Sequence, residues 1–255
     1  MPCILITGAS SGIGAALARH YAGPDATLVL VARDPARLEA VAAACRETGA
    51  AVETERLDVR DRAGVRIFLE AADARHPFDL VIVNAAINGG HPTGGIETEE
   101  MAFETADINL GGALNVMLPM VRLMLARGQG QIALMSSLAA FAPLPDAPAY
   151  SGAKAALFAH GLALREKVRA QGVKINVVTP GYVKTPMGGD YKGWRPLEMS
   201  AEEAARRIAR GLARDQDVVA FPMRLAVLAR GAGLLPERLR RLGMHGFRFQ
   251  IRKRR

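Results

Sequence analysis

Thr7-Gly8-Ala9-Ser10-Ser11-Gly12-Ile13-Gly14 joins a short apolar run at residues 2–7 to an alanine-rich amphipathic run at residues 15–21. These two runs predict a buried strand followed by a helix. Glycines let the backbone turn tightly and approach a pyrophosphate, and the amide groups at the start of a helix attract its negative charge. The stretch therefore predicts a dinucleotide-binding loop with the spacing G-x-x-x-G-x-G. A glycine turn that binds nothing is the alternative.

Apolar runs and helical patterns continue to alternate along the chain. The further predicted strands are residues 26–32, 51–57, 78–84, 131–137, 173–179 and 217–221, and the further predicted helices are 35–49, 63–74, 97–127, 150–171 and 201–214. Because a helix separates each strand from the next, the pattern predicts a parallel sheet covered on both faces. We expect one doubly wound α/β domain of the Rossmann type over residues 1–222, with a seven-stranded parallel sheet, and an extension over 223–255.

Composition and charge narrow the class of protein. Half of the 255 residues are hydrophobic, which allows a sizeable core. The two cysteines, Cys3 and Cys45, cannot build a disulfide framework or a C-x-x-C metal site, so we expect a cytoplasmic protein without a metal. The first residues run directly into the predicted strand, so we expect no signal peptide. The net charge of +8 is concentrated after Val218, where ten basic residues face one Glu.

The end of the second predicted strand bears on the choice of dinucleotide. A NAD-binding unit usually has an acidic residue here for the ribose 2′-hydroxyl, whereas this chain has Ala32 followed by Arg33. Arginine binds a 2′-phosphate, so the pattern favours NADP(H), with NAD(H) as the second option. A solvated Arg33 paired with Asp34 is the alternative. Asp58, after the third strand, either accepts from an adenine amino group or caps the next helix.

Tyr150-Ser-Gly-Ala-Lys154 places a phenol and an amine four residues apart on one helix face. A phenol titrates near ~10 in water, and a nearby ammonium lowers that pKa because it favours the phenolate. The pair predicts a proton donor and acceptor for a carbonyl or alcohol; a chance pair on a solvated helix is the alternative. Asn109, in an apolar helical stretch, indicates either a polar relay near the site or a capped or kinked helix.

Residues 2–222 resemble the short-chain dehydrogenase/reductase family in its NADP-preferring branch. The glycine loop resembles the family's cofactor loop, and Asn84-Ala85 resembles its fourth-strand motif, with Ala86 in place of the usual glycine. Ser137, thirteen residues before Tyr150, has the spacing of the family's catalytic serine. The resemblance implies the catalytic residues Asn109, Ser137, Tyr150 and Lys154. It implies the cofactor-binding residues Gly8, Ser10, Ser11, Gly12, Ile13, Gly14, Arg33, Asp58, Val59, Asn84, Ala85, Tyr150, Lys154, Pro180, Gly181, Val183 and Thr185.

The resemblance also implies a mechanism. Tyr150 gives a proton to the carbonyl oxygen while the nicotinamide delivers hydride to the carbon. Lys154 lowers the pKa of Tyr150 and binds the nicotinamide ribose, and Ser137 fixes the substrate oxygen. Asn109 holds a water that links Lys154 to solvent. A homodimer or homotetramer formed through the helices of Asn109 and Tyr150 is implied as well.

The substrate pocket is expected to form from residues 138–148 and from a lid at 186–199. Both segments are mostly apolar, which predicts a hydrophobic ketone or secondary alcohol as substrate. Lys192 and Arg195 leave an anionic group on that substrate open. The candidate walls are Phe141, Met187, Tyr191 and Trp194.

The extension combines an apolar run with clustered arginines, and two interpretations remain open. It is either a peripheral contact with anionic lipid at the inner face of a membrane, or a helix over the pocket or a dimer seam with a disordered basic end. No nucleic acid is expected, because Phe247 and Phe249 are its only aromatic residues after Phe221. A non-catalytic cofactor-binding scaffold or sensor is the alternative function, which the presence of Ser137, Tyr150 and Lys154 disfavours.

Overall fold

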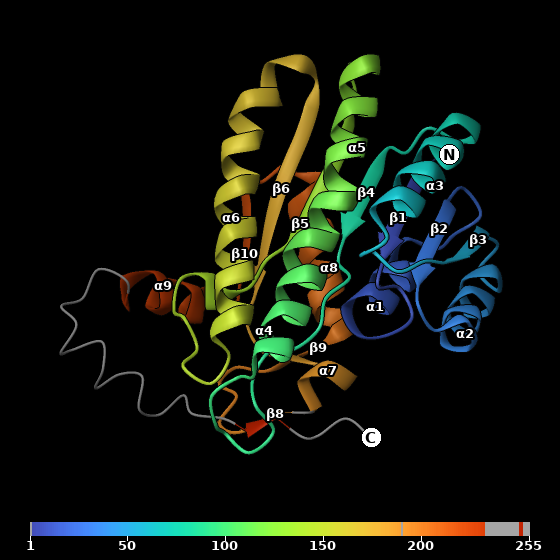
Figure 1. The fold of residues 1–255 in the computed structure, drawn as a ribbon. Helices are drawn as coiled ribbons and strands as arrows, with labels where there is room; N and C mark the ends of the chain where they lie inside the picture. Colours follow the sequence, from blue (N-terminus) through green and yellow to red (C-terminus); the bar gives the residue numbers. More distant parts are fainter. Residues whose placement is uncertain (1, 190, 233–249, 252–255) are drawn as a thin grey trace.

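The computed structural model describes residues 2–189, 191–232 and 250–251. Seven strands form one sheet in the order β10-β6-β5-β4-β1-β2-β3, and every neighbouring pair is parallel (Figure 1). The predicted seven-stranded parallel sheet is confirmed. Its strands are β1 (Cys3–Thr7), β2 (Thr27–Ala32), β3 (Ala51–Arg56), β4 (Leu80–Val83), β5 (Gly130–Met135), β6 (Val173–Pro180) and β10 (Val218–Phe221).

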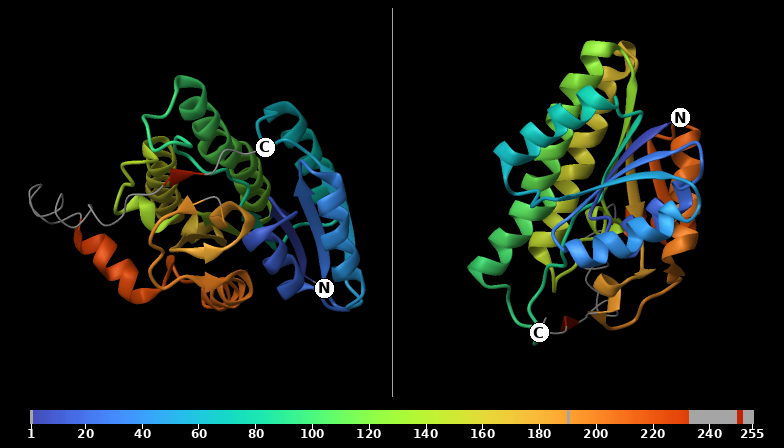
Figure 2. Two further views of the ribbon diagram at one scale, coloured as in Figure 1. Left: turned by 90° about the horizontal axis from the view of Figure 1, so that it is seen from below. Right: turned by 90° about the vertical axis from the view of Figure 1, so that its right-hand side faces the viewer.

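Helices cover both faces of the sheet. One layer contains α1 (Gly12–Tyr21), α2 (Pro35–Arg46) and α8 (Ala201–Ala213). The other contains α3 (Arg62–Arg75), α5 (Ala113–Arg127) and α6 (Pro148–Val168), with α4 (Glu99–Ala106) leading into α5. Seen along the sheet, α5 and α6 lie on one side and α8 lies on the other (Figure 2).

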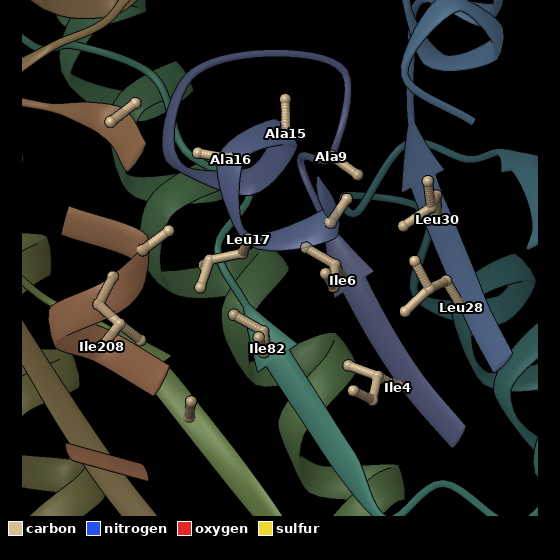
Figure 3. Packing of buried hydrophobic residues seen from close by; sticks show 14 of the residues in the cluster. Ile4, Ile6, Ala9, Ala15, Ala16, Leu17, Leu28, Leu30, Ile82 and Ile208 are labelled. Atoms are coloured by element: carbon tan, nitrogen blue, oxygen red, sulfur yellow. The ribbon is translucent and has the colours of Figure 1, made fainter. Parts of the chain in front are cut away.

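The core consists of two apolar clusters separated by the sheet. Along β1, Ile4 and Ile6 belong to the cluster of the α1 side, whereas Leu5 belongs to the cluster of the α5 side. Figure 3 shows Ile6 of β1 and Ile82 of β4 next to Leu17 of α1, with Ile4 further along β1 and Ile208 of α8 on the other side of Leu17. Because both faces are buried, these strands read as continuous apolar runs rather than alternating ones. Truncating Leu17, which is fully buried, to Ala is expected to cost about 2–5 kcal/mol.

The order of the strands fixes the position of the site. The chain builds β2 and β3 on one side of β1 and then crosses to β4 on the other side. In open α/β sheets, ligands bind beyond the carboxyl ends of the strands where the order reverses. That point lies here after Thr7 of β1 and Val83 of β4.

Shorter elements surround this edge of the sheet. They are the π-helix η1 (Asp107–Gly112), the 3-10 helix η2 (Leu138–Ala140), α7 (Pro186–Gly189), α9 (Met223–Ala232), and the strand pairs β7 (Val183–Lys184) with β9 (Met199–Ser200) and β8 (Tyr191–Lys192) with β11 (Gln250–Ile251). A second 3-10 helix, η3 (Arg169–Gln171), connects α6 to the start of β6 at the opposite edge. The predicted lid at 186–199 thus contains one short helix and short strands. Most of the predicted basic extension, residues 233–249 and 252–255, lies outside the described residues.

Among the described residues, one helical stretch, Glu99–Arg127, is long and apolar enough to cross a membrane, and half of its apolar window is buried in the fold. Its α5 portion places Val116, Met117, Met120 and Met124 in the core. The apolar character of this stretch is therefore explained by packing against the sheet.

Candidate active site

A cleft of about 1620 Å³ opens at the predicted edge of the sheet. Pockets for drug-sized ligands measure about 300–1,000 Å³, so this cleft has room for a dinucleotide together with a second molecule. The predicted residues that line it are Gly8, Ser10, Ser11, Gly12, Ile13, Arg33, Asp58, Val59, Asn84, Ala85, Ser137, Tyr150, Lys154, Pro180, Gly181, Val183 and Thr185. Gly14 and Asn109 are not among the lining residues.

The glycine loop forms a cradle that larger residues would fill. Gly8 has a φ of +67°, and a Cβ on it would lie 2.9 Å from the Cα of Ala85. A Cβ on Gly14 would lie 2.3 Å from the carbonyl oxygen of Gly8, so Gly14 allows α1 to pack against the loop. Ser11 is the N-cap of α1, and its side chain makes no capping hydrogen bond. The first amides of α1 thus remain for an anionic ligand, and the cradle fits a pyrophosphate.

Asn84 braces this loop from the neighbouring strand. Its Nδ2 donates to the carbonyl oxygen of Thr7 at 3.0 Å, and its backbone amide donates to Thr7 Oγ1 at 3.0 Å. The amide of Ala85 donates to the same hydroxyl at 3.1 Å. The side chain of Asn84 therefore holds β1 and β4 together at the edge of the cleft.

Arg33 lines the cleft, is exposed, and forms no ion pair with any described residue. Asp34 pairs instead with Arg37, whose Nε lies 3.2 Å from Asp34 Oδ2. Asp34 also caps α2 by accepting from the amide of Arg37. The alternative of a solvated Arg33 paired with Asp34 is thus met in part: Arg33 is exposed, but among the described residues Asp34 pairs with Arg37 and not with Arg33.

Asp58 lines the same end of the cleft and pairs with Arg60, with 2.6 Å between Oδ2 and Nη2. The hydrogen bond from Arg60 holds the pKa of Asp58 below its ordinary value. The cap of α3 is Asp61, which accepts from the amide of Gly64. The alternative in which Asp58 caps this helix is therefore wrong.

Tyr150, Ser137 and Lys154 meet at the centre of the cleft. Lys154 Nζ lies 5.6 Å from the ring centroid of Tyr150 and donates to the carbonyl oxygen of Met135 at 2.7 Å. Ser136 Oγ donates to the carbonyl oxygen of Lys154 at 2.8 Å and so ties α6 to the end of β5. The alternative of a solvated Tyr/Lys pair is wrong, because Lys154 is 4% exposed.

Burial is the largest cause of the pKa shifts of both Tyr150 and Lys154. It raises the pKa of Tyr150, while a hydrogen bond with the Ser137 side chain lowers it. Burial also lowers the pKa of Lys154 to about 8. The expected net decrease of the Tyr150 pKa is not found, because loss of water around the phenol outweighs the groups that favour the phenolate.

Asn109 lies in the π-helix η1, buried and 1% exposed. Its Oδ1 accepts from the amide of Ile87 at 2.7 Å, and its Nδ2 donates to the carbonyl oxygen of Ile87 at 2.9 Å. Both functional groups of the side chain thus hold the loop after β4. The helix is interrupted here by the π-turn Asp107–Gly112, which contains Asn109. A polar relay through Asn109 stays a prediction.

Apolar side chains form the other half of the cleft. Of the predicted walls, Met187 lines it, whereas Phe141 packs on Phe158 and Trp194 is 64% exposed, so neither is among the lining residues. The side chain of Tyr191 lies outside the described residues. Cleft residues that the sequence did not single out include Asn88, Tyr182, Glu198, Leu225, Val227 and Leu228.

Helix α9 supplies three of those residues and is fixed to the wall of the cleft. Its buried Ala226 and Ala229 pack on Leu138, and the guanidinium of Arg230 lies 4.8 Å from the ring centroid of Phe141. This part of the extension covers the pocket, as one of the two interpretations predicted. The apolar run after β10 was the feature of the sequence that indicated a helix over the pocket.

Comparison with known families matches residues 2–196 to the short chain dehydrogenase family. The chain is 31% identical over 236 residues to an uncharacterised oxidoreductase from Myxococcus xanthus (strain DK1622), covering 92% of this chain and 93% of that protein. It is similar to a short-chain dehydrogenase from Sphingobium yanoikuyae in complex with NADPH, at 29% identity and a TM-score of 0.79, covering 96% and 95%. It is also similar to levodione reductase, at 26% identity and a TM-score of 0.79, covering 89% and 98%.

Proposed function

Because the chain belongs to the short-chain dehydrogenase family, we propose that it is an oxidoreductase that uses NADP(H) and converts apolar ketones and secondary alcohols into one another. The observation that carries the proposal is the cleft itself. One continuous cavity is lined by the glycine loop, by Ser137, Tyr150 and Lys154, and by an apolar wall. A dinucleotide and a carbonyl compound would therefore meet beside a phenol.

The cofactor half of the cleft fits NADP(H). The amides at Gly12 and Ile13 would hold the pyrophosphate, and Arg33, with no ion-pair partner among the described residues, would hold the 2′-phosphate. Asp58 would take the adenine side. The similar protein from Sphingobium yanoikuyae was solved with NADPH, which agrees with this assignment; NAD(H) is the second option. When bound, the nicotinamide supplies the hydride that adds to the carbonyl carbon.

Tyr150 of α6 supplies the proton, and Ser137, the N-cap of η2, lies beside it. Tyr150 donates its phenolic proton to the carbonyl oxygen, and the hydroxyl of Ser137 orients that oxygen. With a pKa of about 8, Lys154 is mostly an ammonium at pH 7 and stabilises the phenolate that remains. Asn109 positions the loop beside them through Ile87 and does not itself line the cleft.

The apolar wall defines the substrate class. Leu138, Leu144, Met187 and Leu225 leave an apolar surface next to the phenol, which favours ketones with hydrophobic substituents. The ion pair of Arg195 with Glu198, with 2.8 Å between Nη1 and Oε1, lines the lid side and adds polar groups to the wall there. One of the similar solved proteins is named levodione reductase, and a reductase agrees with the carbonyl chemistry proposed here.

Two further properties belong to the same proposal. We place the protein in the cytoplasm, since both cysteines are free and buried. We expect a homodimer or homotetramer formed through the layer of α4, α5 and α6, because Phe103 and Leu118 on α4 and α5 are 62% and 46% exposed. Light scattering that gives the mass of one chain would contradict that assembly.

A panel of ketones tests the function. Oxidation of NADPH by the purified chain is followed with small polar, aliphatic, cyclic and aromatic ketones. We expect turnover to be fastest with an apolar ketone and faster with NADPH than with NADH. A chain that binds NADPH but oxidises it with none of them would support the non-catalytic scaffold instead.

A further inference from the structure

The helix that carries Tyr150 begins without a cap of its own. Its N-cap residue is Ala147, which has no side-chain acceptor, and its first residue is Pro148, which has no N–H. The first backbone donor of α6 is therefore the amide of Ala149, directly before Tyr150. Helices whose first amides lack an acceptor lose about 0.5–2 kcal/mol.

Glu97 supplies the missing acceptor from a distant loop. Its Oε2 accepts from the amide of Ala149 at 2.9 Å, across 52 residues of sequence. Glu97 does not cap the helix that it precedes, because Thr98 accepts from the amide of Met101 and caps α4. A carboxylate at the start of α6 also interacts favourably with the helix dipole. Figure 1 shows α4 lying beside the first turns of α6.

The second oxygen of Glu97 shows that this contact is not optimised for stability. Oε1 is buried, and no described residue donates to it. A buried acceptor without a partner costs about 1–3 kcal/mol, a cost that a serine at position 147 would avoid. A local side-chain cap at position 147 would therefore stabilise α6 more than the Glu97 carboxylate does.

Gly89 brings the same loop into direct contact with Tyr150. A Cβ on Gly89 would lie 2.8 Å from the Cβ of Tyr150 and 2.9 Å from Glu97 Oε1. Such contacts are too close for any side chain, so glycine is what allows the loop to pass between the carboxylate and the tyrosine. The position of Glu97 and the position of Tyr150 are therefore mechanically linked.

Two more bonds fix the loop at its other end. Asn109 holds both polar backbone groups of Ile87, and Asn88 Nδ2 donates to the carbonyl oxygen of Met187 in α7 at 2.6 Å. The loop between Ile87 and Glu97 is thus attached to the π-helix, to the lid and to the first turn of α6.

We propose that Glu97 is a positioning residue for the reaction. By anchoring the amide of Ala149 it fixes the first turn of α6, and with it the distance between the Tyr150 phenol and the Ser137 hydroxyl. This proposal rests on the proposed function, in which Tyr150 donates the proton. A displacement of about 1 Å at a reacting group costs about 10²-fold in rate, so the anchor acts on turnover more than on binding.

The test compares Glu97→Ala and Glu97→Gln with the control Glu99→Ala, an exposed glutamate two residues further on. We expect Glu97→Ala to lower kcat about 10- to 100-fold and to leave the Kd of NADPH within about twofold. Glu97→Gln keeps an oxygen for Ala149 and should recover most of kcat, and Glu99→Ala should behave as the wild type. Gly89→Ala, which pushes Glu97 and Tyr150 apart, should also lower kcat. Unchanged kcat in Glu97→Ala, or no recovery in Glu97→Gln, overturns the proposal.

Hydrogen exchange separates this proposal from the proposed function. In the full chain without substrate, the amides of residues 149–151 should exchange about tenfold faster in Glu97→Ala than in the wild type and in Glu99→Ala. Equal exchange in all three proteins overturns the anchor whatever the activity. A wild type that reduces no ketone defeats the proposed function, and faster exchange in Glu97→Ala would then still support the anchor.

Discussion

Lys154 is a buried amine, and its titration gives the structure a measurable dependence of stability on pH. Burial lowers its pKa from 10.5 to about 8, while in the unfolded chain the value stays near 10.5. Between these two values the unfolded chain binds the proton more tightly than the folded one. The stability that Lys154 contributes is therefore fully present above pH 10.5, and it is lost as the pH falls through 8.

The size of the effect follows from the same two values. The full difference corresponds to about 3 kcal/mol, of which about 2 kcal/mol falls between pH 7.5 and pH 10. Burial also raises the pKa of Cys3 to about 11, which makes the folded protein lose stability in this range. A Lys154→Met variant shares that loss, so the comparison of the two proteins removes the contribution of Cys3.

Urea denaturation at pH 7.5 and pH 10 measures the effect in the wild type and in Lys154→Met. On raising the pH, we expect the free energy of unfolding of the wild type to change by about 2 kcal/mol in the stabilising direction relative to the variant. If the two proteins respond to pH within about 0.5 kcal/mol of each other, Lys154 is not desolvated, and the lowered pKa assigned to it is wrong.

Two further predictions concern the ends of the cleft. Arg33→Ala should raise the Kd of NADPH about 10- to 100-fold and leave the Kd of NADH nearly unchanged, because it removes one charged hydrogen-bond donor to a phosphate. Fluorescence titration measures both constants. Parallel changes in the two constants would contradict the assignment of Arg33 to the 2′-phosphate. Leu225→Ala should raise KM about 5- to 30-fold for a bulky apolar ketone but little for a small one, because it removes part of the apolar wall. Met223→Ala, on the same helix with its side chain 65% exposed and outside the cleft, is the control, and an equal effect in it would refute the role of the wall.

The strands and the cofactor loop were predictable because their signals are local. The fully buried strands are continuous apolar runs, and the glycines stand at fixed spacings between a strand and a helix. Predicted strand ends were one or two residues too long at β4 and β5, where polar residues leave the sheet to line the cleft.

Properties that depend on distant partners were not predictable. The sequence marks Asn109 as a polar residue in an apolar helix, but its partner Ile87 lies 22 residues away in a loop. Glu97 gave no signal, because its partner Ala149 is 52 residues away. The spacing of Tyr150 and Lys154 predicted their proximity but not the burial that decides both pKa values. Short-range sequence patterns thus predict the helices and strands, whereas tertiary packing determines the hydrogen-bond partners and the pKa values of the site residues.

The central claim is that the phenol of Tyr150 donates the proton in a nicotinamide-dependent reduction. The most direct test is turnover and NADPH affinity in Tyr150→Phe, which keeps the ring and removes only the hydroxyl. We predict that kcat with the best ketone falls about 10²- to 10⁴-fold while the Kd of NADPH stays within about threefold of the wild type. Turnover near the wild-type rate in this variant would contradict the account.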